Sequence, residues 1–229
     1  LWVDAIFITD RYIMLDITAL LDEIKQHPYL DVSIKTPHTG IIEFTDIEEG
    51  NKVKDVSGEF KEIPGTKIAV ITRENNPRFI HAAQKGIIQK MHKEYNKQFV
   101  EAGTEIGILR HFLSKEEVIE IILQKALHLF YAPERAKYYF TPEIDKKVKI
   151  SGSQTVTVTN GMELFIVSRM KREVPLLYTG PEGIIYQVYF KHNQNIDINQ
   201  PLIGVCSPDQ LQTIEDVVSH VNHEWIEQH

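Results

Sequence analysis

Lys171 is the residue of this 229-residue chain whose setting best suits covalent chemistry. It follows Met170 at the end of an alternating apolar run, residues 163–167, which begins after the turn glycine Gly161. Gly183 opens a second apolar run twelve residues after the lysine. A tight turn between paired antiparallel strands presents its side chains to solvent. The pattern therefore predicts that Lys171 lies at or near the tip of a β-hairpin, where an enzyme can reach its amine.

The chemistry expected of such a lysine is attachment of a cofactor rather than catalysis. A free lysine amine has a pKa of about 10.4 and is mostly protonated at neutral pH. Acylation then requires an activated acyl donor and an exposed, well-posed side chain, and the long lysine stem adds reach. These are the properties of a covalent swinging-arm carrier.

The composition is that of an ordinary soluble globular protein, with 42% hydrophobic and 25% charged residues. A net charge of −7 argues against a nucleic-acid backbone or an anionic membrane as the main partner. Because no apolar run approaches eighteen residues, we expect no membrane insertion. The first residues lack the charged region of a secretory signal, and the single cysteine, Cys206, fits a reducing compartment. These features predict a cytoplasmic protein in which Cys206 is a buried apolar residue.

Hydrophobic periodicity and turn residues divide the chain into five segments. They are an N-terminal strand and helix at 1–30, a β module at 31–111, a helical connector at 112–145, a second β module at 146–206, and a C-terminal amphipathic helix at 207–229. Within the connector, a helix is expected from 113 to about 131, with Ser114 and Glu117 forming a capping box.

The two β segments match each other when one is shifted by 96 residues. Residues 65–73 then fall on 161–169, and after one inserted residue the Gly-Ile-Ile run at 86–88 falls on 183–185. Apolar and turn positions coincide even where the identities differ. We therefore expect a duplicated β module.

The second segment resembles the biotinyl/lipoyl attachment domain family, which includes biotin carboxyl carrier proteins and lipoyl domains. The resemblance rests on a glycine turn and strand, a Met-Lys hairpin, a Gly-Ile strand and a Gln-Pro-Leu strand: Gly161, 163–167, Met170-Lys171, 183–185 and 199–203. It covers 146–206 well and 31–111 more loosely. The resemblance implies two flattened β-barrel (barrel-sandwich) modules, so that the fold is mainly β with flanking helices.

The same resemblance implies that Lys171 is the attachment residue and that a biotin protein ligase recognises Met170. Lipoyl sites more often have an acidic residue before the lysine, so biotin is favoured over lipoate. The implied function is a non-catalytic carrier subunit of a biotin-dependent carboxylase or decarboxylase system, with carboxylase and carboxyltransferase subunits as partners. Neither catalytic residues nor metal ligands are assigned.

The alternative is an unmodified lipoyl-like scaffold or adaptor, as in membrane-fusion proteins. Arg172 after the lysine, Ser168 three residues before it and a bulky return at 178–182 favour this interpretation. The first module has residues 74–77 at the corresponding tip, with no lysine there.

Three other sets of residues leave alternatives open. Arg73 and Arg169 occupy equivalent places and are either partner contacts or solvated turn residues. His220 and His223 are either a metal-binding pair or part of a solvated helix face. The aromatic run at 138–140 is either a docking patch or a seal between a helix and the β module.

Overall fold

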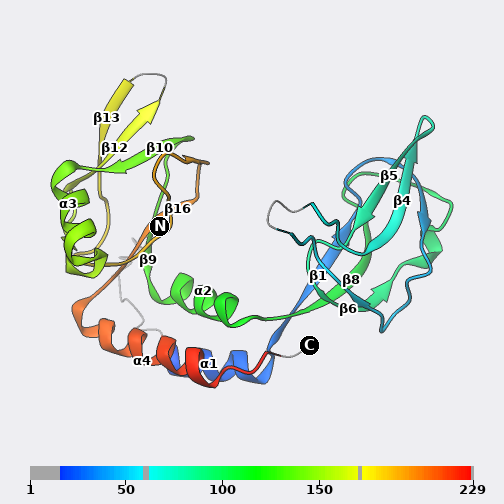
Figure 1. Ribbon diagram of the computed structural model, residues 1–229, viewed down its shortest axis with the longest axis horizontal. Coiled ribbons are helices and arrows are strands. Elements are labelled where there is room, and N and C mark those ends of the chain that lie inside the picture. The colour runs from blue at the N-terminus through cyan, green and yellow to red at the C-terminus, as the bar shows by residue number, and fades with distance from the viewer. Residues whose placement is uncertain (1–15, 59–61, 170–171, 228–229) are drawn as a thin grey trace, which may run out of the picture. The chain divides into compact units, whose positions relative to one another are not determined.

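The computed structural model describes residues 16–58, 62–169 and 172–227 (Figure 1). The described chain is mainly β, as the sequence predicts, and it divides into two compact units. Unit 1 contains described residues 16–23 and 116–225, and unit 2 contains 24–115 with 226–227. The helices are α1 (Ile17–Gln26), α2 (Lys115–Ala126), α3 (Pro142–Ser151) and α4 (Pro208–Glu224), with short 3-10 turns at Lys93–Tyr95 and Ser153–Thr155.

Unit 2 contains two four-stranded antiparallel sheets. One sheet has the order β1-β8-β6-β3, formed by Tyr29–Lys35, Glu105–Phe112, Gly86–Met91 and Lys52–Val53. The other has the order β5-β4-β2-β7, formed by Asn76–His81, Lys67–Arg73, Gly40–Phe44 and Phe99–Val100. Ile42 and Ile71 from the second sheet share one buried cluster with Ile88 and Leu109 from the first. The two sheets therefore enclose a common core.

Unit 1 also contains two four-stranded antiparallel sheets. One has the order β13-β12-β10-β15, formed by Arg172–Leu177, Glu163–Arg169, Ala136–Phe140 and Asn195–Ile196. The other has the order β11-β14-β16-β9, formed by Thr157–Val158, Gly183–Val188, Pro201–Cys206 and His128–Tyr131. Phe165 lies at the centre of the core, with its ring stacked on those of Phe130 at 5.8 Å and Phe140 at 5.2 Å between centroids. Aromatic contacts thus join the two sheets.

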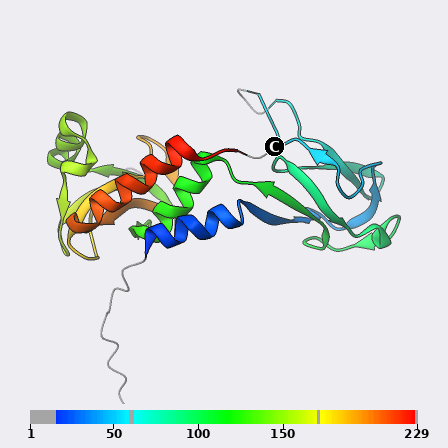
Figure 2. The same ribbon diagram turned by 90° about the horizontal axis from the view of Figure 1, so that it is seen from below.

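Helix α4 follows the last strand of unit 1 where the sequence predicts a terminal amphipathic helix. It buries Ile214, Val217 and Val221 along one face. Figures 1 and 2 show α2 and α4 side by side in this unit. Among the residues that the structure describes, no helix combines the length and apolar character needed to cross a bilayer.

The predicted helical connector at 112–145 is wrong in part. Helix α2 ends at Ala126, and the rest of the segment contains β9, β10 and the start of α3. These two strands belong to the sheets of unit 1, because β9 pairs with β16 and β10 pairs with β12. The β module predicted at 146–206 therefore takes two of its strands from the connector. It also begins with the end of α3, which continues to Ser151, instead of a strand.

Short apolar runs explain this error, because residues 127–131 fit the tail of a helix as well as a strand when no pairing partner is known. The predicted α1 is present, and the strand expected at residues 5–8 lies outside the described residues.

Candidate functional site

The hairpin formed by β12 and β13 is the element that positions the predicted attachment site. Its strands pair antiparallel from Glu163 opposite Leu177 to Arg169 opposite Arg172 (Figure 1). A register shift lets Leu164 and Phe165 both turn into the core, although they are neighbours in the sequence. The hairpin is thereby anchored in the core of unit 1.

Met170 and Lys171 lie outside the described residues. The pairing of the residues on either side of them is described, and it leaves two positions of chain between paired strand ends. The strand before this point lies where the sequence predicts it. The predicted return strand is wrong, because β12 pairs with β13 at Arg172–Leu177, whereas the run that opens at Gly183 forms β14 in the other sheet of unit 1. The exposure of the lysine amine stays a prediction.

A hollow of about 490 Å³ lies against this hairpin, lined by Glu134, Val167, Arg169, Arg172 and Val174. The guanidinium of Arg169 donates a hydrogen bond to Glu134 at 2.6 Å between Nη1 and Oε2. A charge-assisted contact of this length orients both side chains, although their exposure limits its contribution to stability. The sequence left Arg169 as either a partner contact or a solvated turn residue. The structure adds a third role, because Arg169 forms an ion pair with Glu134 within unit 1.

The return from the hairpin, residues 178–182, is folded inward instead of being bulky at the surface. Tyr178 is fully buried, and its ring lies 5.3 Å from that of Phe130. Its hydroxyl donates to the Pro181 carbonyl oxygen at 2.9 Å. The additional bulk of Tyr178 seen in the sequence therefore fills the core of unit 1.

In unit 2, the hairpin formed by β4 and β5 has a fully described tip. Glu74 and Asn75 both have positive φ values, 50° and 62°, and they connect the paired residues Arg73 and Asn76. This is the backbone of a two-residue type I′ turn, which suits the twist of paired strands. The tip contains no lysine, as the sequence indicates. A hollow of about 400 Å³ beside it is lined by His38, Thr39, Ile71, Arg73, Glu74, Asn76 and Arg78.

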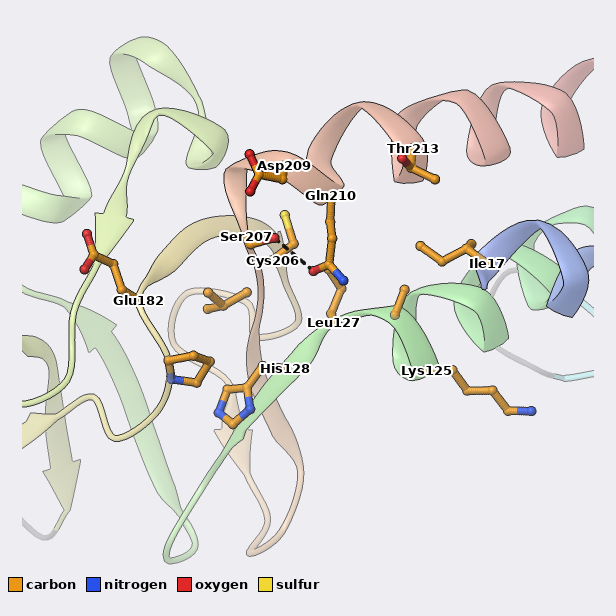
Figure 3. Close-up of a pocket in the computed structure, with 13 residues that line it drawn as sticks. Ile17, Lys125, Leu127, His128, Glu182, Cys206, Ser207, Asp209, Gln210 and Thr213 are labelled. Carbon is orange, nitrogen blue, oxygen red and sulfur yellow. Dashed lines mark hydrogen bonds between the residues drawn. The ribbon is translucent and has the colours of Figure 1, made fainter. Parts of the chain in front are cut away.

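A third hollow, of about 470 Å³, lies in unit 1 and was not predicted from the sequence (Figure 3). It is bounded by the end of α2, the first residue of β9, the 181–182 loop, and the junction of β16 with α4. Ser207 precedes the first turn of α4 there, and its hydroxyl lies 3.2 Å from the Gln210 side-chain oxygen. Its walls come from four separate segments, Ile17 of α1 and residues 125–128, 181–182 and 205–213, so no local pattern could have revealed it.

Burial favours the neutral forms of two groups that line this hollow, the His128 imidazole and the Cys206 thiol. Burial lowers the pKa of His128 below its usual value, and a hydrogen bond to the Thr179 main chain offsets the effect only in part. Burial likewise raises the pKa of Cys206, whose thiol is buried as the sequence predicts. Because the thiolate is the nucleophile, a thiol in this setting is unreactive at neutral pH. The hollow therefore lacks an activated nucleophile.

The remaining sequence candidates have structural roles. His220 contacts Glu224 one turn along α4 at 3.2 Å, and His223 contacts the Ser219 carbonyl oxygen at 2.7 Å. Within the described ranges, no group of three or more His, Cys, Asp or Glu residues is arranged to hold a metal ion.

The aromatic run at 138–140 belongs mainly to the core. Tyr138 and Phe140 are buried, and the Tyr138 hydroxyl donates to the Glu134 carbonyl oxygen at 2.6 Å. Of the two interpretations of this run, the structure supports the seal over the docking patch.

Comparison with known proteins adds no family assignment: no protein-family model matches the chain, and no curated protein has a similar sequence.

Proposed function

We propose that the two units are copies of one β module. Adding 96 to the bounds of four strands of unit 2 gives four strands of unit 1: β2 becomes β10, β4 becomes β12, β5 becomes β13 and β7 becomes β15. An offset of 97 takes β6 to β14. The strand orders correspond as well, since both hairpin sheets place the equivalent strands in the same sequence.

Finer details support a common origin for the two units. The pattern of buried and exposed residues along β4 is the same as that along β12. The register shift between Lys67 and Ala69 has its counterpart between Glu163 and Phe165. Irregularities of this kind are features of a particular fold, so their coincidence is better explained by duplication than by general β architecture.

We further propose that this chain is a biotin carrier protein that presents Lys171 for covalent attachment. The observation that carries the proposal is the pairing of Arg169 with Arg172 across the ends of β12 and β13. In the sequence, Lys171 takes the position that Asn75 has in unit 2, where the residue is exposed in a two-residue turn. Enzymatic acylation of a lysine requires this kind of position.

Under this proposal the chain is a non-catalytic subunit of a biotin-dependent carboxylase or decarboxylase system. A biotin protein ligase recognises Met170 and attaches biotin to the neighbouring Lys171. Biotin is favoured over lipoate because lipoyl sites more often have an acidic residue before the lysine. The attached cofactor moves carboxyl groups between carboxylase and carboxyltransferase subunits.

The test is the intact mass of the chain produced with a biotin protein ligase and biotin. We expect a mass increase of one biotinyl group, detection by avidin, and loss of both in K171R. The matched control K191R changes another exposed lysine of unit 1 and should remain modified. M170A should lower the extent of modification. An unmodified mass with each of several biotin ligases would contradict the carrier function.

An unmodified scaffold is the second candidate, and the hairpin of unit 2 favours it. That hairpin keeps its geometry with Glu74 and Asn75 at the tip, so the module itself does not need a lysine there. A scaffold should be recovered from its native lysate without carboxylase subunits and with an unmodified mass. Recovery of carboxylase subunits would favour the carrier.

A further inference from the structure

Strand β5 lies at the edge of its sheet, and among the described strands it pairs only with β4. Alternate residues of an antiparallel strand direct their main-chain groups to opposite sides. Because Arg73 and Asn76 close a two-residue turn, they form a hydrogen-bonded pair, and the next pair, Thr72 with Pro77, does not. Phe79 has the same phase as Pro77, so its N–H and C=O point away from β4. The outer edge of β5 thus offers a main-chain donor and acceptor.

The outer face of this sheet carries exposed apolar side chains next to that edge, and the Lys67 ammonium lies 3.7 Å from the centroid of the Phe79 ring. Ile41 pairs with Phe99 on one side and Thr72 on the other, and Thr72 pairs with Pro77, which makes a row across all four strands. The side chains of Phe99, Phe79 and Ile41 are 68%, 52% and 48% exposed. Large exposed apolar side chains gathered on one face mark interaction surfaces more often than single ones do.

The inner side of the same hairpin carries cationic side chains. Arg73 and Arg78 line the hollow beside the turn. The Arg78 guanidinium lies 3.4 Å from His38 Nε2, a contact that engages one of its nitrogens. Arg73 lies 3.7 Å from the exposed Glu74, a separation too long for a strong hydrogen bond. These guanidiniums therefore retain donors for a carboxylate.

Unit 1 shows how the same positions look when this surface is absent. By the proposed offset of 96 residues, the edge strand of unit 1 has Pro175 in place of Phe79 and Val174 in place of Arg78. The neighbouring positions also differ: Glu134 stands for His38, Lys137 for Ile41 and Asn195 for Phe99. The proline removes the edge N–H, which is a common way to block an edge strand. In unit 1 the guanidinium of Arg169 already donates a hydrogen bond to the Glu134 carboxylate, at 2.6 Å between Nη1 and Oε2. The module therefore does not need the apolar face or the open edge of unit 2 in order to fold.

From these observations we propose that β5 is a docking edge for an extended segment of a partner protein in which acidic and apolar side chains alternate. The segment adds a fifth strand to the sheet beside Phe79. Its apolar side chains continue the outer row, and its carboxylates reach Arg78 and Arg73 on the inner side, as Glu134 reaches Arg169 in unit 1. A second copy of this chain is a poor occupant, because two β5 strands paired antiparallel with Phe79 opposite Phe79 place Ile80 opposite Arg78 and bring no carboxylate to that guanidinium.

The experiment follows the main-chain amides of the full-length, ¹⁵N-labelled chain by NMR during titration with a capped peptide of alternating glutamate and valine. We expect shifts centred on Phe79 and His81, with binding weakened by added salt. F79P, which copies the proline of unit 1, should weaken binding about tenfold or more through loss of the edge donor. R78V, which copies Val174, leaves the edge intact and should remove most of the salt dependence.

Two control peptides test the alternation and the charge. One has the same composition with all glutamates preceding all valines, and the other replaces glutamate by lysine. Equal binding of either peptide would overturn the proposal, as would the absence of shifts at about 1 mM peptide, a concentration that detects even weak strand addition. A dimeric chain that F79P converts to a monomer would also overturn it. Biotinylation of Lys171 is measured separately, so either proposal can fail alone.

Discussion

Replacement of Gly183 by alanine should strongly destabilise unit 1, because β14 approaches β16 too closely for a side chain. A Cβ atom at this position would lie 2.4 Å from the Cys206 carbonyl oxygen and 2.7 Å from Val205 Cγ1. Carbon and oxygen atoms in close contact are normally about 3.3–3.6 Å apart, so relief requires a movement of about 1 Å. Both neighbours belong to a buried strand, and the movement must separate paired strands.

The expected cost is about 3 kcal/mol, the upper part of the range for overpacking a well-packed core. With a urea dependence of about 2 kcal/mol per molar, the unfolding midpoint falls by about 1.5 M. Gly161→Ala is the matched control: Gly161 has a φ of +84° and no atom within 4 Å of the added Cβ. Only backbone strain opposes that change, so we expect about 1 kcal/mol.

The assay is urea unfolding followed by the NMR signals of each unit separately, because one midpoint does not describe two units. Gly86→Ala provides a second comparison, since its Cβ would lie 2.2 Å from the Arg110 carbonyl oxygen in unit 2. It should lower the midpoint of unit 2 and leave that of unit 1 unchanged. If G183A costs less than G161A, the steric explanation of the Gly-Ile-Ile run is wrong.

Three smaller effects follow from the pKa shifts. The lowered pKa of His128 means that the unfolded chain takes up its proton at a higher pH than the folded chain does, so stability is lost as the pH falls below about 6.5 towards the folded-state pKa, and H128Q should flatten that part of a pH series of unfolding midpoints. The raised pKa of Cys206 predicts that iodoacetamide leaves the folded chain unlabelled at pH 8 and labels it in urea, as measured by mass spectrometry. Arg110 holds the pKa of Asp31 below its usual value through two hydrogen bonds of 2.8 Å, so D31N should cost at most about 1 kcal/mol at pH 7, and the difference from the wild type should vanish in acid below the folded-state pKa of Asp31.

The prediction from sequence was most successful where a residue pattern is local and strong. Strands β12 and β14 and helix α4 lie where alternation, turn glycines and helical spacing place them. The run that begins at Gly183 was read as part of an attachment-domain signature. Its glycine has a packing reason of its own, the closeness of β16, so this part of the signature indicates the fold and carries no information about a cofactor.

The prediction was least successful where a segment's state depends on distant partners. Residues 128–140 were expected in a helical connector whose main helix ended near 131, yet they contain β9 and β10, which pair with β16 and β12 far along the chain. Tyr178 was taken for surface bulk and instead fills the core beside Phe130. Neither outcome is encoded in the residues themselves, because a short apolar run satisfies more than one periodicity.

The sequence by itself determined the mainly β character, the two matching segments and the strand that leads to Lys171, because alternation and turn chemistry act over a few residues. The return strand at Arg172–Leu177 was not predicted. Only the tertiary structure decided which strands share a sheet and that Glu134 forms an ion pair with Arg169. It also decided that β5 is an edge strand whose hairpin places two arginines, Arg73 and Arg78, beside a hollow. Such features depend on contacts between residues distant in the chain, and these contacts form only once the sheets have closed around their cores.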